Sequence, residues 1–169
     1  FHGNSTMDAL AEVLGALTAQ VHGLDAAGSP VDVVIVAGDV FDSATPAGAA
    51  YTLLSDTLVA LSSAGVAVIV TSGNHDSAAR LGFQARLLRD GIHVLTDPLA
   101  IGTPVTLTDA HGPVHFYGIP YLEPAIVRQH WSDVELRTQA QTVAHAMDLV
   151  RAGMAEHAGR SVAIAHCFS

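Results

Sequence analysis

The sequence predicts an α/β fold, a layered double β-sheet sandwich flanked by helices. Short runs of β-branched residues alternate with longer segments whose apolar residues recur at helical spacing, a pattern typical of sheets covered by helices. After Gly91 the pattern changes to short strand-like runs separated by turn residues, which indicates a second sheet. No repeat or linker interrupts the 169 residues, so we expect a single domain over residues 1–169.

The first half of the chain is expected to alternate helix and strand. Apolar residues recur every three or four positions in two segments, which predicts helices over residues 7–24 and 46–64. Two β-branched runs predict strands that are buried on both faces, over residues 31–37 and 66–70.

The second half begins with a third expected helix, over residues 78–89. Gly82 disfavours the middle of this helix by about 1 kcal/mol relative to Ala. Three short runs then indicate strands of the second sheet, at residues 92–95, 105–108 and 114–117. A long helix over 132–157 and a last strand over 161–165 complete the expected order.

The charge balance argues against a surface that grips nucleic acid on its own. Seven Lys and Arg residues stand against sixteen Asp and Glu residues, a formal charge of -9. Nonspecific nucleic-acid binding depends on basic side chains that neutralise phosphates. Bound divalent cations and a basic partner would answer this objection.

The cellular location is expected to be the cytoplasm. No apolar stretch approaches the roughly 20 residues that a membrane-spanning helix needs, so no membrane is expected as a partner. No secretory signal is visible at the N-terminus. The single cysteine, Cys167, fits a reducing compartment and is interpreted as a buried, inert thiol.

Metal-type ligands follow three of the expected strands at the point where each strand ends. Asp39, Asn74 and His166 hold these positions, and we expect them to meet at one edge of a sheet. A mixed oxygen and nitrogen set favours Mn²⁺, Fe²⁺ or Zn²⁺ over Ca²⁺. Gly38 and Gly73 directly precede the first two ligands, where a side chain would block a close approach of the backbone.

The segments Gly38-Asp39-Val40-Phe41-Asp42 and Gly73-Asn74-His75-Asp76 resemble the second and third motifs of the calcineurin-like metallophosphoesterases. Within that superfamily, residues 36–42, 73–77 and 117–122 are similar to SbcD-type DNA nuclease subunits. The resemblance covers essentially the whole chain. It implies hydrolysis of DNA phosphodiester bonds with two divalent metal ions, for which Mn²⁺ is expected. It also implies an SbcC-type, SMC-like ATPase as partner and a homodimer within a heterotetramer.

The same resemblance implies a role for each matched residue. Asp39 would bridge two metal ions, and Asn74 and His166 would be ligands of the second ion. His75 would be a catalytic residue that faces the scissile phosphate and stabilises the transition state or donates a proton to the leaving oxygen. Asp42 is the second catalytic candidate, because Asp42 or Asp76 is expected to orient His75.

Two motifs of the family have no counterpart in this sequence. One is an Asp-x-His motif at the end of the first strand, and the other is a Gly-His-x-His motif beyond the last residue. Phe1-His2-Gly3 resembles the segment that follows the first of these, so His2 is not taken as a ligand. Because a two-metal site needs both ions, we expect these 169 residues alone to be inactive or nearly so.

Plainer interpretations stay open for each site residue. Asp39 is also compatible with a capping or turn carboxylate, Asn74 and His75 with a turn, and His166 with a strand-end imidazole. The remaining histidines lack partner spacing and are interpreted as structural or solvated, at positions 2, 22, 93, 111, 115, 130, 145 and 157. The alternative functions are a calcineurin-like phosphoesterase for a nucleotide or phosphoprotein, and a scaffold that binds no metal.

Overall fold

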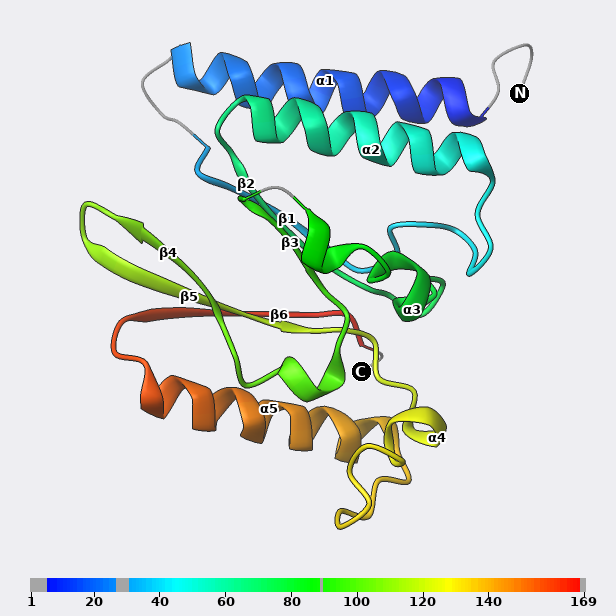
Figure 1. Ribbon diagram of the computed structural model, residues 1–169, viewed down its shortest axis with the longest axis vertical. Coiled ribbons are helices and arrows are strands. Elements are labelled where there is room, and N and C mark those ends of the chain that lie inside the picture. Colours follow the sequence, from blue (N-terminus) through cyan, green and yellow to red (C-terminus); the bar gives the residue numbers. More distant parts are fainter. Residues whose placement is uncertain (1–5, 27–30, 89, 168–169) are drawn as a thin grey trace. The chain divides into compact units, whose positions relative to one another are not determined.

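The computed structural model of the chain describes residues 6–26, 31–88 and 90–167 (Figure 1). In chain order its elements are α1 (Thr6–Ala26), β1 (Val33–Ala37), α2 (Gly48–Ser63), β2 (Ala67–Thr71), α3 (Ala78–Leu81), the 3-10 helix η1 (Ala85–Leu87), β3 (Ile92–Leu95), the 3-10 helix η2 (Pro98–Ala100), β4 (Val105–Asp109), β5 (Gly112–Ile119), α4 (Pro124–Val127), α5 (Gln139–Glu156) and β6 (Arg160–Ala165). The predicted α/β class with two small sheets and helices is confirmed.

The chain divides into two compact units. The first comprises Phe1–Ile35, Thr45–Ile69 and Leu88–His93, and the second comprises Val36–Ala44, Val70–Leu87 and Val94–Ser169. None of the described helices is both long enough and apolar enough to cross a bilayer.

Strand pairing assigns two strands to sheets other than the expected ones. The first sheet has the order β1-β2-β3, and the second has the order β4-β5-β6. β3, expected in the second sheet, therefore lies in the first. β6 pairs in parallel with β5, which itself pairs antiparallel with β4. A parallel pair needs a long crossover, and the segment that contains α4 and α5 supplies it between β5 and β6.

Burial differs between the two strands that were both expected to be buried on two faces. β2 fulfils the expectation, because the side chains of Val68, Ile69 and Val70 are fully buried. β1 does not, since none of its residues is buried and Ile35 is 41% exposed. β2 is the central strand of its sheet, whereas β1 lies at the edge. Branched apolar residues thus predicted the strand correctly but not its depth.

The third helix is shorter than predicted. α3 ends at Leu81, and the chain continues through a turn into η1 instead of remaining α-helical; residue 89, the predicted end, lies outside the described residues. Gly82 is the C-cap residue of α3. A Cβ atom at this position would lie 2.2 Å from Thr96 Oγ1, so the close approach of Thr96 accounts for glycine here.

The long helix α5 begins at Gln139 rather than at residue 132. Thr138 Oγ1 accepts a hydrogen bond from the Gln141 backbone N–H, and Gln141 Oε1 accepts one from the Thr138 N–H. This capping box satisfies two backbone donors at the helix start. The helix therefore begins where the cap forms, and the residues before Thr138 are irregular.

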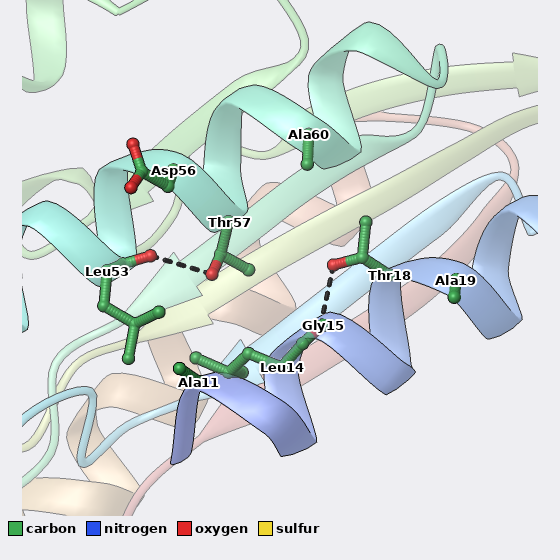
Figure 2. Close-up of a pocket in the computed structure, with 9 residues that line it drawn as sticks. All are labelled: Ala11, Leu14, Gly15, Thr18, Ala19, Leu53, Asp56, Thr57 and Ala60. Carbon is green, nitrogen blue, oxygen red and sulfur yellow. Dashed lines mark hydrogen bonds between the residues drawn. The ribbon is translucent and has the colours of Figure 1, made fainter. Parts of the chain in front are cut away.

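Within the first unit, α1 and α2 lie side by side (Figure 1). A groove of about 410 Å³ runs between them and is lined largely by small side chains, among them Ala11, Gly15 and Ala60 (Figure 2). Its two threonine hydroxyls, of Thr18 and Thr57, each donate a hydrogen bond to a carbonyl of their own helix. Besides these hydroxyls, Asp56 contributes a carboxylate to the lining.

The core of the second unit forms where α5 packs against β5. Tyr117, Ile119 and Val150 are fully buried in it. On β5, a Cβ atom at Gly118 would lie 2.5 Å from Leu95 Cδ1 and 3.1 Å from Thr71 Cγ2. The ends of β2 and β3 thus pack closely on β5, which brings the loops that follow β2 and β6 into one region.

Candidate functional site

The loop after β1 places Asp39 in an uncommon backbone conformation. Asp39 has a φ of 48° and follows Gly38, whose φ is 83°. Left-handed φ values are costly for most residues and tolerated by glycine and, to a lesser degree, by aspartate. This double left-handed turn directs the loop after β1 toward the residues that follow β2 and β6.

Gly38 and Gly73 are both required by close contacts, as the sequence predicted. A Cβ atom at Gly38 would lie 2.4 Å from His166 Nδ1. A Cβ atom at Gly73 would lie 2.1 Å from Asp39 Oδ1 and 2.2 Å from its backbone nitrogen. Any side chain at either position would displace a candidate ligand.

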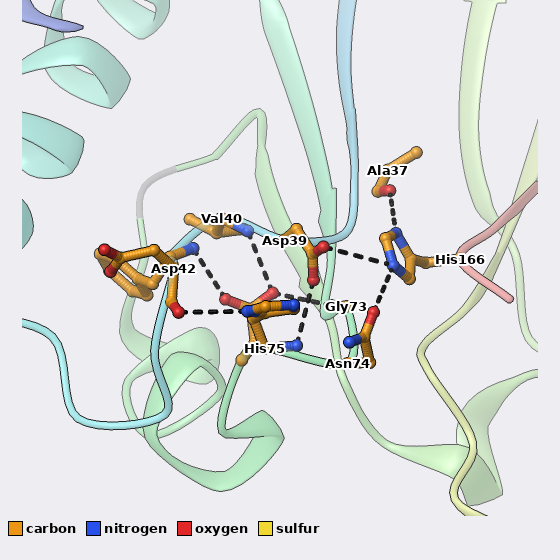
Figure 3. A network of polar contacts seen from close by, with 10 residues as sticks. Ala37, Asp39, Val40, Asp42, Gly73, Asn74, His75 and His166 are labelled. Carbon is orange, nitrogen blue, oxygen red and sulfur yellow. Dashed lines mark hydrogen bonds and ion pairs between the residues drawn. The ribbon is translucent and has the colours of Figure 1, made fainter. Parts of the chain in front are cut away.

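The three candidate metal ligands lie together, as expected (Figure 3). His166 Nε2 is 3.0 Å from Asn74 Oδ1 and 3.6 Å from Asp39 Oδ2. They meet although His166 follows β6, in the second sheet, whereas Asp39 and Asn74 follow strands of the first. The expected neighbourhood of three strands in one sheet was therefore wrong, and packing between sheets brings the residues together.

The hydrogen-bond roles within this cluster are unbalanced. His166 Nδ1 lies 3.0 Å from the Ala37 carbonyl oxygen, which only accepts, so Nδ1 carries the proton. In a neutral ring Nε2 is then an acceptor, and it faces the Asn74 and Asp39 oxygens, which also accept. In that neutral form, three acceptors converge with no donor among them. A cation between them would satisfy all three.

The donor set fits one divalent ion with open positions. It comprises an imidazole nitrogen, an amide oxygen and a carboxylate oxygen, and the side chains of His166 and Asp39 are 25% and 39% exposed. Three protein ligands with access to solvent are typical of catalytic rather than structural metal sites. Across the described part of the chain, no group of three or more His, Cys, Asp or Glu side chains is arranged to hold a metal. Asp39 and His166 form a candidate metal site only together with Asn74, whose amide oxygen is the third ligand.

His75 is exposed and is held at two points. Its backbone N–H donates to Asp39 Oδ1 at 3.1 Å, and its ring Nδ1 lies 3.1 Å from the Asp42 carbonyl oxygen (Figure 3). Asp42 was expected to orient His75, and it does so through its main chain, not through its carboxylate. The reason is that the loop after β1 turns its carbonyl toward the ring.

Asp76 was the other residue expected to orient His75, but its carboxylate contacts the backbone instead. It accepts hydrogen bonds from the N–H groups of Gly73, Val40 and Phe41 at 2.7, 3.1 and 2.9 Å. Two of these donors lie 35 and 36 residues away in sequence. No sequence pattern pairs residues that far apart, so this role was missed.

Two further residues support the site without having been singled out. Arg80 Nη1 donates to the Ala44 carbonyl at 2.8 Å and so ties α3 to the loop after β1. The Tyr121 ring stands edge-on to His166 at 6.5 Å between ring centroids, and its backbone N–H donates to the Ser72 carbonyl at 2.8 Å. Tyr121 belongs to the segment 117–122 that carried part of the family resemblance, which was the signal available for it.

Residues 1–3, which resemble the segment after the absent first motif, lie outside the described residues. The sequence model of the calcineurin-like phosphoesterase family matches residues 1–166. This match covers nearly the whole chain, and the chain therefore belongs to that family. Phosphoester hydrolysis and binding of divalent metals are the general properties of the family.

Proposed function

We propose that this member of the calcineurin-like phosphoesterase family acts in the cytoplasm as a DNA nuclease subunit of the SbcD type, with Mn²⁺ bound at Asp39, Asn74 and His166. The observation that carries the metal site is the convergence of an imidazole nitrogen, an amide oxygen and a carboxylate oxygen, which all accept when the ring is neutral. The nuclease type is supported by the sequence of residues 36–42, 73–77 and 117–122.

The ligands are already oriented for a cation. The Ala37 carbonyl fixes the tautomer of His166, so that Nε2 points its lone pair into the cluster. Asp39 has a second oxygen, held by the His75 N–H, and we propose that the Asp39 carboxylate bridges a second ion. Divalent cations, when bound, neutralise phosphate charge and lower the pKa of water.

His75 is proposed to act on the leaving oxygen of the substrate. Its Nδ1–H is taken up by the Asp42 carbonyl, so Nε2 would carry a transferable proton when both ring nitrogens are protonated. The His75 backbone N–H donates to Asp39, so one hydrogen bond links the proposed proton donor to the proposed metal ligand. The exposure of His75 leaves its ring open to a substrate.

Because the chain is acidic, the proposed nuclease needs a partner that supplies basic side chains to hold DNA. Four of the described arginines are already bonded within the chain: Arg80 to the Ala44 carbonyl, and Arg137, Arg151 and Arg160 to carboxylates. These contacts compete with binding of a DNA backbone, and the net charge of -9 opposes it further. We therefore include in the proposal a basic partner, the SbcC-type ATPase, and a homodimer within a heterotetramer.

A second candidate is a phosphoesterase that acts on a nucleotide or a phosphoprotein. The net charge of -9 and the paired arginines favour it, because a small substrate needs few basic contacts beyond the metal site.

Calorimetric titration with Mn²⁺ tests the metal site. We expect saturable binding that Asn74→Ala weakens and that His130→Ala, a change at an exposed histidine outside the cluster, leaves unchanged. Absence of saturable binding by the unaltered chain would contradict the proposal and favour a scaffold.

The substrate class is read from binding. Fluorescence anisotropy of a labelled DNA duplex is measured with Mn²⁺ and an SbcC-type ATPase present, with a nucleoside monophosphate as competitor. Binding of the duplex that resists the competitor supports the nuclease. Displacement of the duplex at low competitor concentration favours the nucleotide phosphoesterase.

A further inference from the structure

The carboxylate of Asp76 joins the two loops that carry the proposed metal ligands. Its Oδ2 accepts from Gly73 N–H and Val40 N–H, and its Oδ1 accepts from Phe41 N–H. Gly73 directly precedes Asn74, and Val40 and Phe41 directly follow Asp39. One side chain therefore binds the backbone next to each of two ligands that come from different strand ends.

These bonds also hold Asp39 in its left-handed conformation. A non-glycine residue with a φ of 48° persists only where its surroundings impose that conformation. The two residues after Asp39 donate their N–H groups to the same carboxylate, which fixes the direction of the chain as it leaves the turn. Hydrogen bonds to an ionised acceptor are about twice as strong as neutral ones, so this tie is well suited to the task.

We infer that Asp76 is a positioning residue for the metal site: its carboxylate sets Asp39 relative to Asn74 without touching His75 or an ion. This inference rests on the proposed function of the cluster. It assigns Asp76 a role different from orienting His75, which the Asp42 carbonyl contacts instead.

The variant Asp76→Asn tests the inference with little change in shape. One carboxylate oxygen becomes an NH₂ group, which cannot accept. The new amide loses the fewest hydrogen bonds when its NH₂ group lies opposite the Phe41 N–H. Its oxygen then keeps the bonds from Val40 and Gly73. We expect amide hydrogen exchange at Phe41, measured by NMR on the metal-free protein, to accelerate more than exchange at Gly73.

Mn²⁺ affinity is the readout that separates positioning from general stability. We expect Asp76→Asn to weaken Mn²⁺ binding about 10- to 100-fold, the usual effect of losing a group that orients a ligand. Asp97→Asn is the matched control, because Asp97 also accepts a backbone N–H, from Leu99 at 2.9 Å, but in an exposed turn outside both loops. Its Mn²⁺ affinity should equal that of the unaltered chain.

Asp76→Glu keeps both acceptor oxygens on a side chain one methylene longer, and it should bind Mn²⁺ with intermediate affinity. It also serves if Asp76→Asn does not fold. Equal Mn²⁺ affinity in the unaltered chain and in the folded Asp76 variant overturns the inference and leaves the proposed function intact. No Mn²⁺ binding by the unaltered chain overturns the proposed function, and the positioning of a metal site with it. A loss in Asp97→Asn as large as in Asp76→Asn also overturns the inference.

Discussion

His115 and His166 each place one ring nitrogen on a main-chain carbonyl, but their other nitrogens face opposite kinds of partner. His115 lies in β5 and is 5% exposed. Its Nε2 is 3.1 Å from the Ala158 carbonyl oxygen, and its Nδ1 is 2.8 Å from Thr106 Oγ1. The carbonyl accepts and the hydroxyl can donate, so a neutral His115 ring has both nitrogens satisfied.

At His166, the second nitrogen meets two acceptors and no donor. The two environments show that a histidine is better interpreted from its partners than from its position at a strand or a strand end. A ring with complementary partners is part of the core, as expected for His115. A neutral ring whose lone pair converges with other lone pairs leaves room for a positive charge, either a proton on the ring or a metal ion. The predictions below test whether this distinction holds.

The largest expected effect is on metal binding by His166→Ala. We expect Mn²⁺ affinity to fall by more than about 100-fold, because loss of a ligand exceeds the usual cost of losing an orienting group. Isothermal calorimetry measures the change. The metal-free variant should lose less stability in urea than His115→Ala, since the Ala37 carbonyl loses its donor but one of three converging polar atoms is removed. Unchanged Mn²⁺ affinity would place His166 with His115 as a structural residue.

His115→Ala should do the reverse. We expect the free energy of unfolding to fall by about 2 kcal/mol, because a buried ring is removed and the Ala158 carbonyl loses its donor. Urea denaturation followed by circular dichroism measures this loss. Mn²⁺ affinity, compared at a temperature where both proteins are folded, should be the same. A weakened metal site in this variant would show that the two histidines are coupled.

Thr106→Val removes only the donor to His115 Nδ1. Thr106 lies directly opposite His115 in the β4–β5 register. We expect a loss of about 1 kcal/mol in the free energy of unfolding, the typical contribution of one hydrogen bond. Thr108→Val, two residues along the same exposed face, is the control and should change stability by less. Equal losses in the two variants would mean that the hydroxyl of Thr106 is not what satisfies the ring.

The smallest expected effect is a pH dependence at the turn that joins β4 to β5. A hydrogen bond from Arg160, followed by one from the His111 backbone, lowers the pKa of Asp109 from 3.8 to about 2. Because the folded pKa lies below the unfolded one, the stability from this pair is present above about pH 4. It is lost as the pH falls through about 2.

Thermal unfolding of the metal-free protein between pH 5 and about pH 2 measures this dependence. Asp109→Asn should show a shallower decline in midpoint than the unaltered chain over that window. Because the pair is exposed to solvent, the difference should be small and should shrink in high salt. Parallel pH profiles would remove Asp109 as a contributor.

Local patterns predicted most elements because their causes are local. Helical spacing located α1 and α2 to within about two residues, since an amphipathic face depends on residues three and four apart. β-branched runs located β2 in the same way. The break at Gly82 and the start of α5 at Thr138 were missed in position, because a contact with Thr96 and a side-chain cap decide them.

The sequence predicted which residues form the candidate site but not how the fold brings them together. Asp39, Asn74 and His166 were found because metal-type ligands follow strands, and glycines precede the first two. Their convergence from two sheets was not foreseen, because strand order depends on which strands pair. The Asp76 carboxylate accepts hydrogen bonds from the backbone of Val40 and Phe41, which lie 36 and 35 positions away. Only the folded chain brings these residues together.

The sequence by itself determined the kinds of element, the chemistry of the ligands and the family, since these depend on residue identity and on short-range spacing. The tertiary structure alone decided the exposure of β1, the assignment of β3 and β6 to their sheets, and which histidine has a complementary environment. These properties depend on contacts between distant segments, and it is those contacts that separate His166 from His115.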